Sequence, residues 1–201
     1  MSGLEVLDPS GGASAGDGHK LAPRLVSTAG TTLGVVCNGL GNSETFFDEL
    51  IVQLLALGGF AKVVKVVKDS KSVPPTEEQW TQLREVDVAV TGFGGCGSCS
   101  TRAARDALEL EWQGIPTVYV GHPALAPAVA AICKISGHPD YPQIHGHLDP
   151  PVAAWADDDA RALGRELAGA VYDAMVDPTS DAALLTSVPT RNDAALSGAG
   201  R

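Results

Sequence analysis

Short apolar runs alternate with amphipathic segments along most of this 201-residue chain. Short runs rich in apolar and β-branched residues are typical of strands, and they occur at 32–37, 61–67, 86–91 and 115–120. Segments with helical spacing of apolar positions lie at about 43–58, 77–84, 100–113, 123–135 and 156–176. This alternation predicts an α/β fold, a three-layer αβα sandwich with a mostly parallel, doubly wound sheet.

The two ends of the chain differ from this pattern. Residues 1–27 are rich in Gly, Ser, Ala and Asp without apolar periodicity, which predicts a flexible leader. Residues 177–201 hold few large apolar side chains, which predicts a flexible tail. We therefore expect a single α/β domain over residues 28–176, which is an ordinary domain size.

Charge and hydropathy exclude several classes of function. Fourteen basic residues against twenty-four acidic ones give a formal net charge of −10, so we expect no nucleic-acid partner. The lysines of 62–71 follow an alternating strand pattern, which predicts a solvated face. No window approaches the roughly 18 apolar residues of a membrane helix, and the first 26 residues lack the apolar core of a signal peptide. We expect a cytoplasmic protein with no membrane partner.

Two of the four cysteines form a C-x-x-C pair at a predicted strand-to-helix turn. In a reducing compartment such a pair more often serves redox, metal or nucleophilic chemistry than a structural disulfide. The free N–H groups at the start of a helix favour thiolate at Cys96, and Cys99 is placed one turn on to resolve an adduct there. The alternative is that both cysteines are small buried apolar residues beside turn-forming glycines.

The glycine-rich segment 92–99 brings bare backbone to the same place. Its N–H groups are available to an anionic or polar ligand, and the substrate-binding candidates in and beside it are Gly94, Gly95, Gly97, Ser98 and Ser100. We expect no metal, because a second C-x-x-C and an H-x(3–5)-H spacing are both missing. We expect no other cofactor, since the G-x-G-x-x-G match at 92–97 is weak by itself.

Other candidates stand at the carboxyl ends of predicted strands, where ligands bind in open α/β sheets. Cys37, followed by Asn38, ends the first strand, which in doubly wound sheets often neighbours the third. Cys37 and Cys96 would then form an acid/base pair, unless Cys37 is a buried strand-end cysteine. His122 follows the fourth strand, and a proline-rich segment supplies further histidines. His122, His138 and His145 are acid/base or binding candidates near neutral pH, or exposed loop histidines.

Several of these segments resemble the UGSC family, which is named for a Sec-Gly-Ser-Cys motif with cysteine often in the first position. The likeness covers residues 30–176, and it is carried by 90–100, 106–111, 114–118 and 137–142. Asn38 and Asn42 match two asparagines after the family's first strand, whereas Cys37 stands in place of its Asp. The resemblance implies a thiol or selenol active site at Cys96 with Cys99 as partner. A more distant likeness is to the aspartate/glutamate racemase superfamily.

Three hypotheses of function follow. The leading one is a thiol-dependent oxidoreductase acting on a small molecule, with Cys96 as nucleophile, Cys99 as resolving thiol and a cellular thiol as reductant. The second is a redox-neutral racemase, lyase or dehydratase that uses Cys96 and Cys37 as acid/base or covalent catalysts. The third is a non-catalytic module that binds an anion on the glycine-rich loop. A homo-oligomer is compatible with all three.

Overall fold

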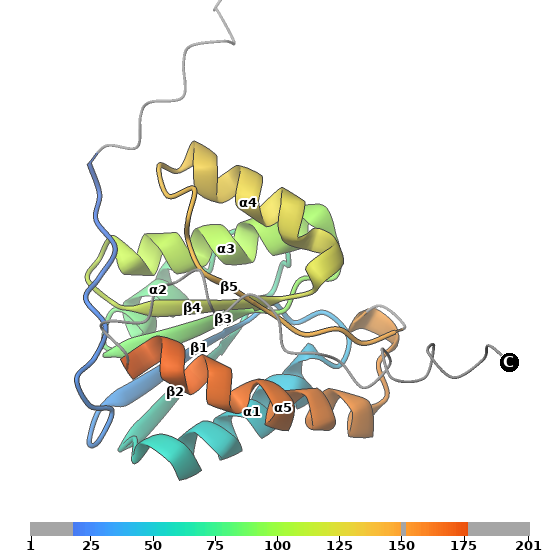
Figure 1. The fold of residues 1–201 in the computed structure, drawn as a ribbon, viewed down its shortest axis with the longest axis horizontal. Helices are drawn as coiled ribbons and strands as arrows, with labels where there is room; N and C mark the ends of the chain where they lie inside the picture. The colour runs from blue at the N-terminus through green and yellow to red at the C-terminus, as the bar shows by residue number, and fades with distance from the viewer. Residues whose placement is uncertain (1–17, 150–151, 177–201) are drawn as a thin grey trace, which may run out of the picture.

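The structure is a computed structural model that describes residues 18–149 and 152–176 as a three-layer α/β domain (Figure 1). The five strands are β1 (Thr32–Cys37), β2 (Lys62–Val67), β3 (Val88–Gly92), β4 (Thr117–Gly121) and β5 (Gln143–His145). The α-helices are α1 (Ser43–Gly58), α2 (Glu77–Leu83), α3 (Gly97–Glu111), α4 (Ala126–Ile135) and α5 (Asp157–Val176). Two short 3-10 helices are η1 (Pro123–Leu125) and η2 (Val152–Ala154). The predicted fold class is confirmed.

The sheet is parallel throughout, in the order β2-β1-β3-β4-β5. β1 pairs with β3, as the sequence predicted, and Cys37 lies opposite Gly92 in that pairing. At the other edge Gly121 of β4 lies opposite His145 of β5. The carboxyl ends of β1, β3, β4 and β5 therefore lie at the same end of the sheet, where ligands bind in folds of this type.

Helices cover both faces of the sheet (Figure 1). α1 and α5 pack on one face, where Leu33, Val35 and Cys37 of β1 join the core. α2, α3 and α4 pack on the other face, where Val36 of β1 contributes. Successive strand residues point to opposite faces, so the side chain of Cys37 belongs to the α1/α5 layer.

Local sequence signals set the helix ends. α1 stops at Gly59, which takes a left-handed conformation (φ 64°) and donates its N–H to the carbonyl of Leu55. α2 starts with a capping box between Thr76 and Gln79. No helix within the described ranges is long and apolar enough to span a membrane.

The segment before β1 departs from the predicted flexible leader in its described part, residues 18–27. The backbone N–H of Ala22 donates to Glu111 Oε2 at 2.8 Å, and Arg24 Nη1 lies 2.6 Å from Glu111 Oε1. The side chain of Glu111 is fully buried. A buried carboxylate needs donors, and this segment supplies them. Residues 1–17 and the predicted tail, 177–201, lie outside the described residues.

Replacing Arg24 tests this attachment. We expect Arg24→Met to lower the free energy of unfolding by about 1.5–3 kcal/mol, because a buried carboxylate loses its charged donor. Thermal and urea unfolding measure the loss. Arg84→Met is the matched control: Arg84 pairs with the exposed Glu77, so its removal should cost less than about 0.5 kcal/mol. Equal losses in the two variants would contradict the anchoring role of Arg24.

Candidate functional site

The C-x-x-C pair lies at the start of α3. Cys96 is the N-cap residue, and its sulfur accepts the backbone N–H of Cys99 at 3.4 Å. The two sulfur atoms lie 2.7 Å apart, in hydrogen-bond contact, and both cysteines are free thiols. Cys96 is exposed, whereas Cys99 is 6% exposed. One accessible sulfur is thus in contact with one sheltered sulfur.

Hydrogen bonds separate the acidities of the two thiols. The bond from Cys99 lowers the pKa of Cys96, and bonds from Ser98 and from the Cys99 backbone lower it further. Burial raises the pKa of Cys99, as does its contact with Cys96. Once Cys96 is deprotonated, the pair's remaining proton sits on Cys99, which then donates to the thiolate. The lowered pKa of Cys96 favours its thiolate form over that of Cys99.

The loop after β2 covers the dithiol, a contact that the sequence did not predict. Ser72 Oγ lies 3.3 Å from Ser98 Oγ and 3.6 Å from Cys99 Sγ. Lys68, in the same loop, is 3% exposed, so the prediction of a solvated lysine face is wrong at this position. Its Nζ lies 2.7 Å from Asp106 Oδ2, a fully buried carboxylate on α3.

The Lys68–Asp106 ion pair interacts electrostatically with the dithiol. Burial lowers the pKa of Lys68, and Asp106 opposes this effect, as does the nearby Cys99. Asp106 also accepts from Arg102 Nε at 2.7 Å, which balances its charge on the other side. One signal was present in the sequence: Asp106 lies among the alanines and leucines of the apolar stripe of α3, where an unpaired carboxylate is costly.

Glycines in the 92–97 segment permit close packing. A side-chain carbon on Gly94 would collide with the Ser100 backbone, with its nitrogen at 2.5 Å. One on Gly95 would collide with Leu40 and with Val152 Cγ1, whereas one on Gly97 would meet open space. Ser100 is fully buried beneath the loop, so it supports the loop rather than facing a ligand. The backbone of Gly94 and Gly95 remains at the surface of a pocket.

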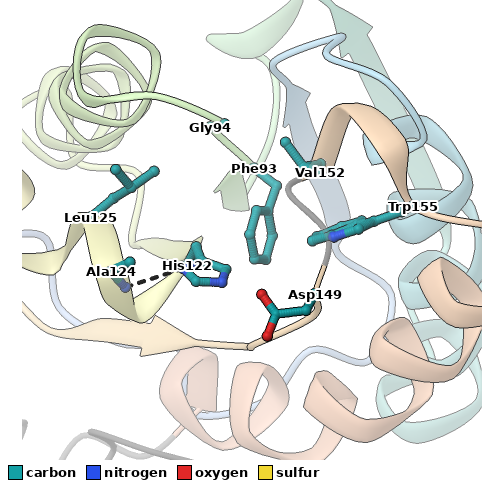
Figure 2. Close-up of a pocket in the computed structure, with 9 residues that line it drawn as sticks. Phe93, Gly94, His122, Ala124, Leu125, Asp149, Val152 and Trp155 are labelled. Carbon is teal, nitrogen blue, oxygen red and sulfur yellow. Dashed lines mark hydrogen bonds between the residues drawn. The ribbon is translucent and has the colours of Figure 1, made fainter.

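The pocket has a volume of about 170 Å³ and opens beside the glycine-rich loop (Figure 2). It is lined by Phe93, Gly94, Gly95, His122, Ala124, Leu125, Asp149, Val152 and Trp155. Gly95, which lines the pocket, directly precedes Cys96 in the chain. Phe93 and Trp155 meet edge to face with ring centres 4.9 Å apart, which gives the pocket an aromatic wall.

His122 supplies a polar group to this pocket. Its Nδ1 accepts the backbone N–H of Ala124 at 3.1 Å, and its ring centre lies 4.7 Å from that of His147. Burial lowers the pKa of His122, and the charge of His147 lowers it further, so the ring is neutral at pH 7. Within the described part of the chain, no group of His, Cys, Asp and Glu is arranged to hold a metal ion.

Comparison with known proteins identifies the family of the chain. A family model described as "UGSC family" matches residues 5–177. The chain belongs to the UGSC family. No curated protein matches the sequence. Among solved structures, it is similar to the microcin C7 self-immunity protein MccF in complex with aspartyl sulfamoyl adenosine (16% identity, TM-score 0.40, 80% of this chain, 48% of that one) and to its apo state (14%, 0.39, 85%, 48%). The chain spans about half the length of these proteins.

The two asparagines by which the chain resembled the UGSC family have structural roles. Asn38 Nδ2 donates to the carbonyl of Cys99 at 3.2 Å and to that of Lys71 at 3.0 Å, so it holds the dithiol helix and the covering loop together. Asn42 Nδ2 donates to the carbonyl of Trp155 at 2.6 Å and to Asp157. In this UGSC protein Asn42 therefore holds Trp155, which lines the pocket, and is not itself among the lining residues.

Three residues of this UGSC protein that the sequence predicted for the site do not contact the dithiol. Cys37 is fully buried in the α1/α5 layer, its sulfur lies 3.5 Å from Ser43 Oγ, and burial raises its pKa. It cannot face Cys96 in this conformation, because α3 covers the other side of the sheet. His138 accepts from Trp112 at the far end of α3, about 20 Å from Cys96 by helix length. His145 lies near His122, bonded to Gln143.

The acidity of Cys96 is testable by its alkylation rate across pH. We expect Cys99→Ala to raise the pKa of Cys96 and to slow its alkylation by iodoacetamide several-fold at pH 7, because the thiolate loses its nearest donor. Mass spectrometry of the labelled peptides measures the rate. Cys133→Ala is the control, since Cys133 is fully buried with a pKa raised to about 11. An unchanged profile in Cys99→Ala would contradict the coupling.

Proposed function

We propose that this UGSC protein is a thiol-dependent oxidoreductase that reduces a small molecule at the Cys96–Cys99 pair. The observation that supports it is the contact between an exposed sulfur of lowered pKa and a sheltered sulfur of raised pKa, 2.7 Å apart. A nucleophile and a resolving thiol require this difference, because the first must attack as thiolate while the second stays protonated.

The chemistry runs in two displacements. The Cys96 thiolate attacks the electrophilic sulfur of a substrate R–S–X, a new S–S bond forms between Cys96 and R–S, and X leaves with the bonding electron pair. Cys99 then loses its proton and attacks the Cys96 sulfur, so the Cys96–Cys99 disulfide forms and R–S⁻ leaves. The substrate gains two electrons and the dithiol loses two. A cellular thiol acts as the reductant and restores both free thiols.

The surroundings of the pair suit these steps. The backbone N–H groups that start α3 stabilise negative charge on Cys96. The buried Lys68 interacts electrostatically with Cys99, so it favours the thiolate that forms when Cys99 attacks. Cys99 needs only a short movement, since its sulfur already contacts that of Cys96. The pocket beside Gly95 offers the substrate a place next to the nucleophile.

The two other hypotheses have less support. An acid/base pair of Cys96 and Cys37 requires a Cys37 thiol that reaches the substrate, and this sulfur is buried against Ser43 on the other face of the sheet. A purely non-catalytic anion-binding module leaves the opposed acidities of Cys96 and Cys99 without a role. The pocket lining includes no Lys or Arg among the described residues, so only backbone N–H groups would offset the charge of an anion beside Asp149.

Trapping of the mixed disulfide tests the proposed function. With bis(2-hydroxyethyl) disulfide as an uncharged probe, we expect Cys99→Ser to accumulate a stable adduct on Cys96, because the resolving thiol is gone. The wild-type protein should instead release the thiol and form the Cys96–Cys99 disulfide. Intact-mass and peptide mass spectrometry distinguish the two products.

Two variants control this experiment. Cys96→Ser should form no adduct and no disulfide, and Cys37→Ala should behave as wild type. Loss of reaction in Cys37→Ala with full reaction in Cys99→Ser would contradict the proposal and favour the acid/base hypothesis. Equal behaviour of all variants would contradict the proposal and favour the binding-module hypothesis.

A further inference from the structure

The pocket contains a buried donor that lacks an acceptor. Trp155 is 4% exposed and lines the pocket, and its Nε1–H has no hydrogen-bond partner among the described residues. Figure 2 shows the nitrogen edge of the indole turned toward the pocket, across from His122. A buried N–H without a partner costs free energy, so the site is built for an acceptor that a ligand brings.

The indole is held in this position from three sides. Phe93 and Phe46 pack against its ring, with ring centres 4.9 and 6.4 Å away. Asn42 binds its backbone carbonyl at 2.6 Å. The donor is therefore fixed before a ligand arrives, which reduces the entropy cost of binding.

His122 provides a second donor on the opposite wall. Since its Nδ1 accepts the N–H of Ala124, the proton of the neutral ring is on Nε2. No hydrogen bond from Nε2 is made within the described part of the chain, and Figure 2 shows this nitrogen turned toward the pocket interior. Two neutral N–H donors, His122 Nε2 and Trp155 Nε1, thus face the same space.

The charge and the size of the pocket limit the class of ligand that it can bind. Asp149 is the charged residue among those that line the pocket, so an anionic group there would be repelled. A cationic amidinium has no acceptor for the two N–H donors, so it leaves both of them unpaired. The volume of about 170 Å³ compares with a cavity of about 150 Å³ that holds benzene in another protein. The remaining walls are apolar, as in most small-molecule sites.

We infer that the pocket binds an uncharged carbonyl compound of about benzene size. The carbonyl oxygen accepts from Trp155 Nε1 and His122 Nε2, and a neighbouring N–H or O–H of the ligand donates to Asp149. This inference goes beyond the proposed function, because it concerns the ligand that the pocket binds and not the sulfur that Cys96 would attack. The binding itself is measurable without turnover.

Benzamide, benzoate and benzamidine test the inference, because they share one shape and differ in charge. We expect benzamide to bind, and benzoate and benzamidine to bind about tenfold more weakly or worse, since Asp149 repels the carboxylate of benzoate and benzamidine has no acceptor for the two N–H donors. The readout is the indole N–H resonance of Trp155 in ¹⁵N-labelled full-length protein. The chain has three tryptophans, so Trp155→Phe assigns that resonance.

Two variants separate donor loss from misfolding. Trp155→Phe keeps an aromatic wall without the N–H and should weaken benzamide by about twofold to tenfold, measured on the shifts of Phe93 and His122. Trp112→Phe is the matched control, because its Nε1 donates to His138 outside the pocket, and it should leave the affinity unchanged. Equal losses in both variants overturn the inference.

The outcomes distinguish this inference from the proposed function. Tighter binding of benzoate or of benzamidine overturns the inference, and so does a Trp155 indole resonance that none of the three probes moves. Trapping of the mixed disulfide in Cys99→Ser without any benzamide shift would overturn the inference alone. A benzamide shift without trapping would support the inference and overturn the proposed function.

Discussion

The turn from β3 into α3 is the constraint on which the site depends. The chain leaves the sheet at Gly92 (φ 150°), where a side chain would collide with the carbonyl of Val120, and passes Gly94 against the Ser100 backbone. This tight path brings Cys96 to the cap of α3, where its sulfur accepts the Cys99 N–H. It also lays Gly95 along the pocket. The position of Cys96 and part of the pocket lining therefore both follow from one glycine-rich turn.

Buried charges hold the helix that carries the dithiol. In its second half Asp106 pairs with Lys68 from the β2 loop, and at its end Glu111 accepts from Arg24 and from Thr117. Both carboxylates are fully buried. Each therefore needs donors nearby, and the segments that supply these donors are held against α3. The loop that bears Lys68 also bears Ser72, which contacts Cys99. The ion pairs thus stabilise the fold and shape the site together.

The sequence predicted what local patterns determine. The apolar runs located four strands, the pairing of β1 with β3 followed from the fold class, and the Cys96–Cys99 pair lies at the predicted turn. β5 was missed because three residues with one buried apolar side chain carry little periodicity. Lys68 and Trp155 were missed because their partners lie far away in sequence. Cys37 was misplaced because its orientation depends on strand parity, which the sequence pattern left open.

Equilibration of the wild-type protein in glutathione redox buffers, followed by peptide mass spectrometry, shows whether Cys96 and Cys99 act as a redox pair. We predict a reversible Cys96–Cys99 disulfide whose fraction follows the buffer potential, while Cys37 and Cys133 stay as thiols because both are fully buried. A stable glutathione adduct on Cys96 without that disulfide would contradict the assignment of Cys99 as the resolving thiol. Oxidation of Cys37 at the same potential would contradict the separation of the two faces of the sheet.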